Sequence, residues 1–203
     1  MKEKEIDIFE QTKKFNTGIR LYMFQTGSIK TKLKFIKMNQ SDEPYEIPIP
    51  WFLIKHPEGD VVIDGGMPIE VALDKHKHWG SVVEAYDPVM KASEWCKDVV
   101  KTVNTKPEDV KYVIQTHLHL DHSGAIGHFP NATHITQKLE YDYAFNPDWF
   151  SQPAYIRADF DKPNIRWKFL QGRKTDFYDV YGDGVIKVIF TPGPVSYTHL
   201  RAH

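Results

Sequence analysis

Three histidines and an aspartate lie within a six-residue stretch of this 203-residue chain, in the segment Thr116-His117-Leu118-His119-Leu120-Asp121-His122. Neutral imidazoles and a carboxylate are ligands that Zn²⁺ and similar cations prefer. Side chains two residues apart in an extended segment project to the same side, so His117 and His119 can hold one cation. Asp121 and His122 follow where the chain turns and predict a second cation. Ligand sets this close suit two metals roughly 3.5 to 4 Å apart.

A polar loop that happens to be rich in histidine is the alternative explanation of this segment. It accounts well for one isolated histidine, but poorly for three histidines and an aspartate directly after an apolar run. The other histidines are isolated, and we expect His128 and His134 to be surface or core residues rather than ligands.

The apolar run 110–116 predicts a core strand that leads straight into the cluster. A second buried strand is expected at 61–63 and ends in Asp64-Gly65-Gly66. It follows a strand at 51–54 and a turn at 57–60.

The rest of the chain alternates between strand-like and helix-like patterns, which indicates layered α/β or α+β architecture. A strand is expected at 19–25, and a short strand or extended arm at 33–38. Three prolines predict a loop around 44–50. Further strands are expected at 132–136, 167–170 and 185–191, helices at 68–73, 88–103 and 138–145, and a long loop at 146–164.

Composition argues against several classes of function. The 26 basic residues are balanced by 27 acidic ones, with no basic block, so we expect no nucleic-acid partner. No stretch approaches the roughly 20 apolar residues of a membrane helix, so we expect no membrane partner. The single cysteine, Cys96, excludes an intrachain disulfide and favours a cytoplasmic location. The oligomeric state stays open.

The spacing His117-x-His119-x-Asp121-His122 resembles the metal-binding motif of the metallo-β-lactamase superfamily. The resemblance extends to the N-acyl homoserine lactone lactonases and covers roughly residues 19–193. The segments that carry it are Lys37-Met38-Asn39-Gln40, Tyr45-Glu46-Ile47-Pro48, Val62-Ile63-Asp64-Gly65-Gly66, Pro130-Asn131-Ala132-Thr133-His134 and Tyr178-Asp179-Val180-Tyr181-Gly182-Asp183-Gly184.

This resemblance implies an α/β fold, the metallo-β-lactamase-type four-layer αβ/βα sandwich. It implies two divalent metal ions, zinc by preference, with His117 and His119 on the first and Asp121 and His122 on the second. The implied reaction is hydrolysis of the lactone ring of a small-molecule N-acyl homoserine lactone. Asp121 is the implied catalytic residue, which orients the nucleophile or carries a proton to the leaving oxygen. Asp64 would both form a turn and orient a metal-bound imidazole.

The resemblance stops at Pro194, where the family pattern implies a further histidine ligand after Thr191-Pro192-Gly193. We therefore expect an incomplete metallo-β-lactamase-like hydrolase domain over residues 1–193, without the C-terminal part of the fold, and a non-family tail over 194–203. The 203-residue chain itself is expected to be inactive. Two alternatives stay open: another hydrolase on this scaffold, such as a glyoxalase II-like thioesterase, or an inactive fragment.

Overall fold

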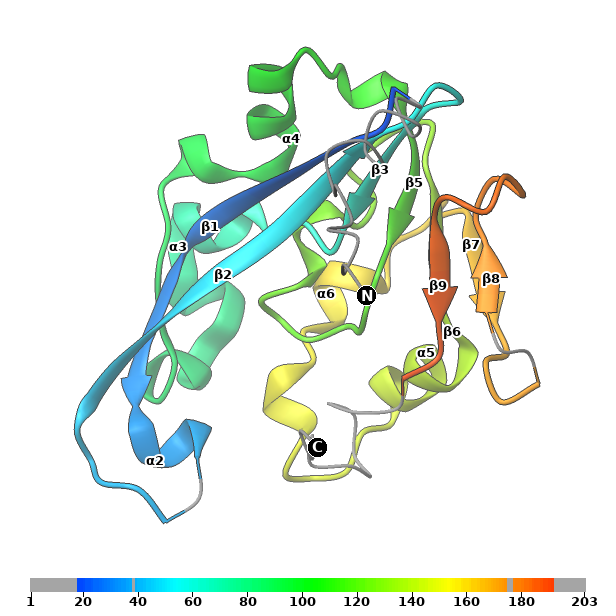
Figure 1. Cartoon of the computed structure of the whole chain (residues 1–203). Coiled ribbons are helices and arrows are strands. Elements are labelled where there is room, and N and C mark those ends of the chain that lie inside the picture. Colours follow the sequence, from blue (N-terminus) through cyan, green and yellow to red (C-terminus); the bar gives the residue numbers. More distant parts are fainter. Residues whose placement is uncertain (1–17, 38, 175–176, 192–203) are drawn as a thin grey trace, which may run out of the picture.

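One large mixed sheet organises the chain (Figure 1). The computed structural model describes residues 18–37, 39–174 and 177–191. Within them the sheet has seven strands in the order β4-β1-β2-β3-β5-β6-β7. Their bounds are β1 Arg20–Lys32, β2 Pro44–Lys55, β3 Asp60–Ile63, β4 Asp87–Val89, β5 Val110–Ile114, β6 Thr133–Gln137 and β7 Trp167–Leu170. A separate hairpin pairs β8 Phe177–Asp179 with β9 Lys187–Ile189.

The parallel half of the sheet places the ends of β3 and β5 next to each other. β3 pairs with β5, β5 with β6 and β6 with β7, all in parallel. Val61, Val62, Val110 and Val113 are fully buried, as expected for strands covered on both faces. Because parallel strands end at the same edge, the residues after Ile63 and after Ile114 emerge side by side.

The helices are short and lie around this sheet. The α-helices are α2 Leu33–Ile36, α3 Ile69–Trp79, α4 Cys96–Val99, α5 Lys138–Phe145 and α6 Arg157–Phe160. The 3₁₀ helices are η1 Gly80–Glu84, η2 Ala92–Glu94, η3 Val100–Val103, η4 Pro107–Asp109, η5 Ser123–Ala125 and η6 Gln152–Ala154. No helix in this part of the chain has the length and apolar character needed to cross a membrane.

Several predicted elements are confirmed and others are wrong. The helix at 138–145 is α5, and the strand at 167–170 is β7. The helix predicted over 88–103 is wrong at its start, because β4 pairs there with β1 and helical structure begins only at Ala92. The loop at 146–164 contains η6 and α6, which sequence patterns this short do not reveal.

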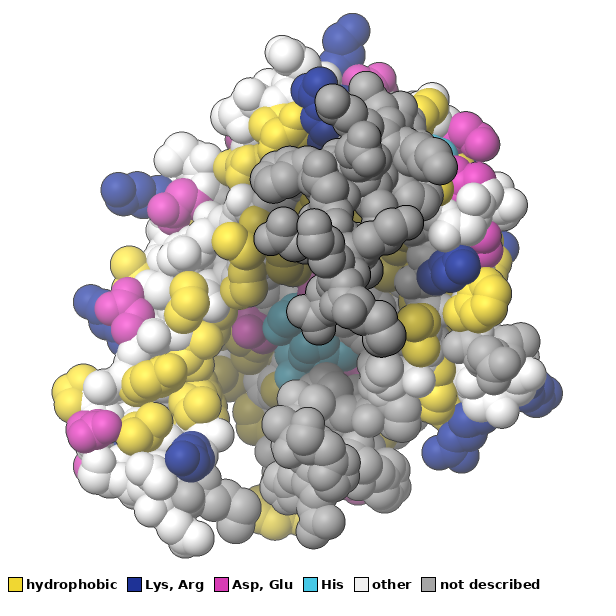
Figure 2. Space-filling view, in the orientation of Figure 1, with side chains coloured by type: hydrophobic (Ala, Val, Ile, Leu, Met, Phe, Trp, Pro, Cys, Tyr) yellow, Lys and Arg dark blue, Asp and Glu magenta, His cyan; other side chains and the backbone are white. Residues whose placement is uncertain are grey.

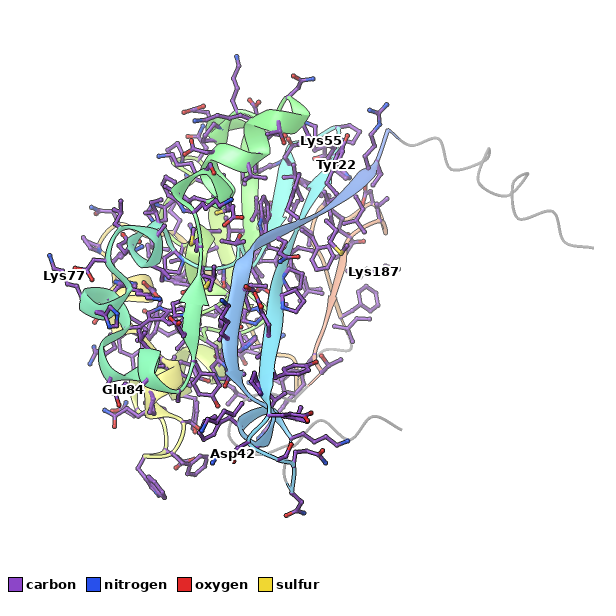
Figure 3. All side chains as sticks on the ribbon, turned by 90° about the vertical axis from the view of Figure 1, so that its left-hand side faces the viewer. Tyr22, Asp42, Lys55, Lys77, Glu84 and Lys187 are labelled. Atoms are coloured by element: carbon purple, nitrogen blue, oxygen red, sulfur yellow. The ribbon has the colours of Figure 1, made fainter. Side chains whose placement is uncertain are left out.

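A long hairpin of β1 and β2 extends along one side of the molecule. Its register runs from Arg20 opposite Lys55 to Lys32 opposite Pro44, and Figure 3 shows it between the labelled Lys55 and Asp42. The expectation at 33–38 is wrong as a strand, because Leu33–Ile36 forms α2 at the tip of this hairpin. Its residues are all at least partly exposed.

The loop predicted around 44–50 is also wrong, because these residues belong to β2. Pro44, Pro48 and Pro50 all occupy even positions, and backbone N–H groups alternate between the two sides of a strand. The missing N–H groups of all three prolines can therefore face away from β1. On that other side, β3 pairs only with residues 52–54, so no ladder hydrogen bond is lost.

Backbone packs directly on backbone where the turn after β3 meets η5. The N–H of Gly124 donates to the carbonyl of Gly66 at 2.8 Å. A Cβ at Gly124 would lie 2.6 Å from the Met67 carbonyl oxygen and 2.7 Å from those of Gly65 and Gly66. Three backbone atoms cannot rotate away as a side chain could, so position 124 admits only glycine.

Gly124→Ala should therefore lower the free energy of unfolding by about 3 kcal/mol, the upper end of the usual cost of overpacking. The control is Gly182→Ala, where φ is +81° and nothing lies within 4 Å of the added Cβ. It should cost only the backbone strain, about 1 kcal/mol. Urea unfolding of both variants measures the difference, and equal losses would contradict the steric argument.

The buried carboxylate of Asp159 in α6 contacts both α3 and η5. Asp159, which is 1% exposed, accepts the Ser123 hydroxyl at 2.9 Å through Oδ2 and lies 2.7 Å from His78 Nε2 through Oδ1. The hydrogen bond to Asp159 raises the pKa of His78, burial opposes the shift, Glu70 adds to it and Lys162 reduces it. The folded state therefore favours the charged imidazole.

This arrangement predicts pH-dependent stability. A histidine whose folded pKa is raised contributes stability that is fully present below its unfolded pKa, about 6.5, and is lost as pH rises through the folded value. The stability difference between wild type and His78→Gln should thus be larger at about pH 6 than at about pH 9. His76→Gln, an exposed position on the same helix, is the control for removing a histidine. A difference that grows with pH would refute the ion pair.

Candidate metal centre

The histidine cluster begins directly after β5 and ends where η5 begins. Residues 115–122 form no regular helix or strand, and His117 and Leu118 are buried within this segment. Figure 2 shows histidine side chains in a hollow of the molecular surface, with hydrophobic side chains over β1 and β2 on one side. The strand predicted over 110–116 thus delivers the cluster to the edge of the sheet, as the sequence indicates.

The three imidazoles of the cluster lie against one another. The ring centroid of His117 lies 4.5 Å from that of His119 and 4.1 Å from that of His122. Asp121 Oδ2 lies 3.4 Å from Nε2 of His122. The structure therefore brings together the four residues named from the sequence: His117, His119, Asp121 and His122.

Alternate backbone N–H groups hold this irregular segment in place. The N–H of Thr116 donates to Asp64 Oδ1 at 2.8 Å, and that of Leu118 donates to Glu140 Oε1 at 2.8 Å. The N–H of Leu120 donates to the Ala154 carbonyl at 2.9 Å. Three separate parts of the fold thus satisfy the N–H groups of Thr116, Leu118 and Leu120, as a β-ladder would in a strand. The candidate ligands His117 and His119 lie between these anchored residues.

Asp64 touches two sides of the cluster at once. Its Oδ2 lies 2.9 Å from His122 Nδ1 and accepts the Thr116 hydroxyl at 2.9 Å. Thr116 Oγ1 in turn lies 3.0 Å from His117 Nδ1. A hydroxyl that donates to Asp64 has a lone pair for the Nδ1–H of His117, and this tautomer leaves Nε2 free to bind a cation. Asp64 has a φ of +64°, so it also forms the turn expected from the sequence.

Burial keeps two of the imidazoles neutral. It lowers the pKa of His117 to about 2, with His122 and His119 acting in the same direction. It lowers the pKa of His119 to about 4, although Asp121 opposes the shift. A metal ligand must be an unprotonated imidazole, so both rings are in the required state at neutral pH without further cost.

His122 and Asp121 form the charged part of the cluster. Burial works against a charged His122, but the contacts with Asp121 and Asp64 outweigh it and raise the pKa of His122. Burial likewise opposes ionisation of Asp121, yet the bond to His122 and the neighbouring imidazoles lower the pKa of this carboxyl. Two carboxylates thus converge on one imidazole, which is protonated at neutral pH, so a metal ion bound by His122 would have to displace that proton.

The donor chemistry fits a divalent metal ion. The cluster offers three ring nitrogens and a carboxylate, and Nδ1 of His122 meets a carboxylate as the outer nitrogen of a metal-bound imidazole usually does. Within the described residues, no three His, Cys, Asp or Glu side chains point their ligating atoms at one common position. The fit therefore rests on the identity, charge state and proximity of the donors.

The remaining histidines and the cysteine have structural surroundings. His134 is 2% exposed and accepts the Gly127 N–H through Nε2, which confirms the expectation of a core residue. His128 packs edge-on against Trp95. Cys96 is fully buried, and burial raises the pKa of its thiol to about 12, so it is an inert apolar residue. Pro194 and the segment 194–203 lie outside the described residues.

Sequence reasoning missed Glu140 and Tyr155, which line the back of the cluster. Tyr155 lies edge-on to His119 with ring centroids 4.8 Å apart, and Glu140 binds the Leu118 amide. A single signal was available for Glu140: its acidic side chain occupies a helix position that faces the core. Both residues are far from the motif in sequence, so only the folded chain reveals them.

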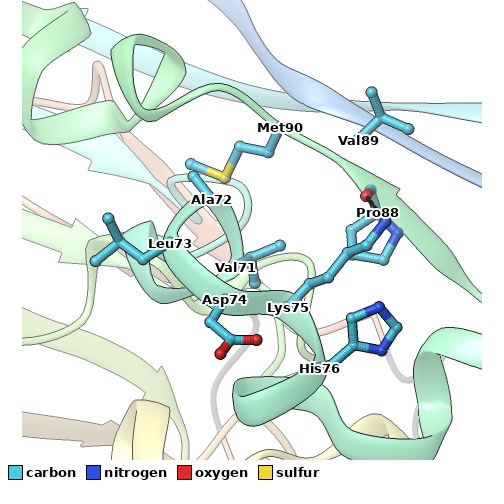
Figure 4. A pocket seen from close by; sticks show the side chains of 9 residues that line it. All are labelled: Val71, Ala72, Leu73, Asp74, Lys75, His76, Pro88, Val89 and Met90. Carbon is cyan, nitrogen blue, oxygen red and sulfur yellow. Dashed lines mark hydrogen bonds between the residues drawn. The ribbon is translucent and has the colours of Figure 1, made fainter.

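A cleft of about 460 Å³ lies elsewhere, between α3 and β4 (Figure 4). None of the four cluster residues lines it. Its walls combine the apolar Val71 and Met90 with polar residues such as Asp74 and Lys75. The cleft is therefore separate from the candidate metal centre.

Comparison with known proteins identifies relatives with the same fold. The profile of the Metallo-beta-lactamase superfamily matches residues 45–200. The N-acyl homoserine lactonase AttM of Agrobacterium fabrum is 58% identical over 178 residues, which are 87% of this chain and 68% of that protein. The N-acyl homoserine lactonase AiiA of Bacillus thuringiensis subsp. kurstaki is 28% identical over 178 residues, 86% of this chain and 66% of that protein.

A solved structure agrees with these sequence matches. An N-acyl homoserine lactone hydrolase with the product N-hexanoyl-L-homoserine bound at its catalytic metal centre superimposes with a TM-score of 0.72 and 25% identity. The match covers 85% of this chain and 65% of that one, so this chain spans about two thirds of the length of its relatives. With its α/β fold, its match to the superfamily profile and its identity to AttM, the chain belongs to the metallo-β-lactamase superfamily and, within it, to the N-acyl homoserine lactonase family.

Proposed function

We propose that the candidate metal centre of this chain serves hydrolysis of the lactone ring of N-acyl homoserine lactones. The single observation that carries the proposal is the cluster of His117, His119, Asp121 and His122 in a chain 58% identical to a lactonase. The product named in the related solved structure, an N-acyl homoserine, is the molecule that such a reaction gives. Water adds to the lactone carbonyl carbon, and the bond between that carbon and the ring oxygen breaks.

Each residue of the cluster has a role in this proposal. His117 and His119 would hold one divalent ion, and Asp121 and His122 the other, with zinc the expected metal. Bound metal supplies Lewis acidity, which polarises the lactone carbonyl and lowers the pKa of water. Asp121, ionised at neutral pH, accepts a hydrogen bond from the attacking water and passes the proton to the ring oxygen as it leaves.

Thioester hydrolysis of the glyoxalase II kind is the alternative reaction on this scaffold, because the same metal chemistry attacks both carbonyls. The identity to AttM favours the lactone. The hollow over the histidines, with apolar side chains of β1 and β2 beside it, suits a substrate with a polar ring and an acyl chain. We also propose a cytoplasmic location, where the free thiol of Cys96 stays reduced.

Lactone opening is tested with residues 1–191 continued by the corresponding C-terminal segment of AttM, loaded with zinc. We expect N-hexanoyl homoserine lactone to gain the mass of one water, and His119→Ala to reduce kcat/KM by about 10³-fold or more because a metal ligand is lost. His76→Ala is the matched control at an exposed histidine away from the cluster and should retain activity. Hydrolysis of a glutathione thioester without any lactone opening would transfer the assignment to the alternative.

Asp64→Asn tests the carboxylate that joins the two sides of the cluster. Asparagine keeps the shape and tolerates a positive φ, but it presents a weaker acceptor to His122 Nδ1 and the Thr116 hydroxyl. Zinc affinity, measured by competition with a chromophoric chelator, should fall about 10- to 100-fold. Asp98→Asn, at an exposed ion pair, is the control. An unchanged affinity in Asp64→Asn would remove Asp64 from the metal centre.

A further inference from the structure

Glu140 is a buried carboxylate to which the proposed reaction gives no role. It is 4% exposed, and burial raises its pKa to about 7. Its Oε1 accepts the N–H of Leu118 at 2.8 Å. The Tyr155 hydroxyl lies near this carboxyl group and acts against burial, because it lowers the pKa of Glu140. Burial of a carboxyl group is costly, so its presence calls for a specific reason.

Helix capping does not supply that reason. Glu140 is the third residue of α5, a position where glutamate often bonds back to the backbone at the start of its own helix. Here the residue before α5, Gln137, takes part in no such side-chain cap. Glu140 instead reaches a backbone amide 22 residues earlier in the chain. Its hydrogen bond therefore serves the loop and not the helix.

The amide that Glu140 binds lies between two imidazoles of the cluster. Leu118 is flanked by His117 and His119, and its side chain is buried with Ala144 of α5 and with Tyr155. The main chain and side chain of Leu118 are thus both held against one helix. Rotation of the peptide between His117 and Leu118 would move the Cα of His117 directly and would redirect the backbone that leads to His119.

We propose that Glu140 is a positioning residue of the metal centre, which sets the relative orientation of His117 and His119 by holding the Leu118 amide between them. The inference rests on the proposed function, since it assigns these imidazoles to a metal. An oxygen acceptor is the required feature, and a negative charge is not. A carboxylic acid or an amide oxygen at this position performs the same role.

Three variants of the 203-residue chain separate this role from general stability. Glu140→Gln keeps the oxygen acceptor, and Glu140→Leu removes it at similar volume. Leu139→Gly weakens the same helix at an exposed position and leaves Glu140 and the packing around Leu118 intact. Two measurements are made on each: hydrogen exchange of the Leu118 amide by NMR without metal, and zinc affinity by competition with a chelator. The first does not depend on metal or activity.

Glu140→Leu should speed exchange at Leu118 about tenfold or more, relative to its effect on core amides such as that of Val113. It should also weaken zinc binding about 10- to 100-fold. Glu140→Gln and Leu139→Gly should give exchange rates and zinc affinities close to those of the wild type, after correction for any change in the free energy of global unfolding.

The inference would be overturned if Glu140→Leu had the same zinc affinity and the same Leu118 exchange rate as the wild type. Equal losses in Glu140→Gln and Glu140→Leu would also overturn it, because the charge would then matter and the acceptor would not. A wild-type chain that binds no zinc, while Leu118 exchange still follows the series, would overturn the link between Glu140 and a metal in this chain and leave the anchoring of the loop standing; lactone opening by the completed protein tests the proposed function separately.

Discussion

The carboxylate of Asp64 is the contact on which the candidate site depends most. It lies at the end of β3 and binds the backbone and hydroxyl of Thr116 at the end of β5. It also meets His122 six residues further on. Parallel pairing makes this possible, because it brings the two strand ends to the same edge of the sheet. One side chain thus links the sheet to both ends of the histidine segment.

A segment without regular secondary structure can hold its side chains in fixed positions only if its backbone N–H groups find hydrogen-bond acceptors in other parts of the fold. Here the anchors are a strand end, a helix and a loop, through Asp64, Glu140 and the Ala154 carbonyl. The close contact of Gly124 with the turn after β3 holds η5, which follows the segment, in place. Each anchor is a single hydrogen bond or contact of modest strength, but together they leave the loop few alternative conformations.

Burial and neighbouring charges set the protonation states of the cluster. His117 and His119 are kept neutral by burial, while Asp121 and Asp64 place two carboxylates around His122. Removing charges from water is expensive unless they are compensated, and the protonated His122 provides that compensation. A divalent ion that displaced this proton would take over the same role.

The amino-acid sequence alone determined the motif, the strand that delivers it and the family, because these depend on neighbours in the chain. Spacing predicted that His117, His119, Asp121 and His122 would lie together, and the apolar run before them predicted β5. The helix at 138–145 could also be predicted from neighbouring residues, since the length and pattern of this stretch were sufficient to predict α5.

Only the tertiary structure decided the secondary structure of segments that pair with residues far away in the sequence. The prolines of β2 are compatible with a strand because, among the described residues, no strand pairs with the other side of that stretch. Pro88 lies in a strand because β1 pairs with it. Glu140 and Tyr155 join the site through folding over more than twenty residues. Local spacing cannot report such contacts, because the hydrogen bonds and buried surfaces that stabilise them exist only after the sheet has formed.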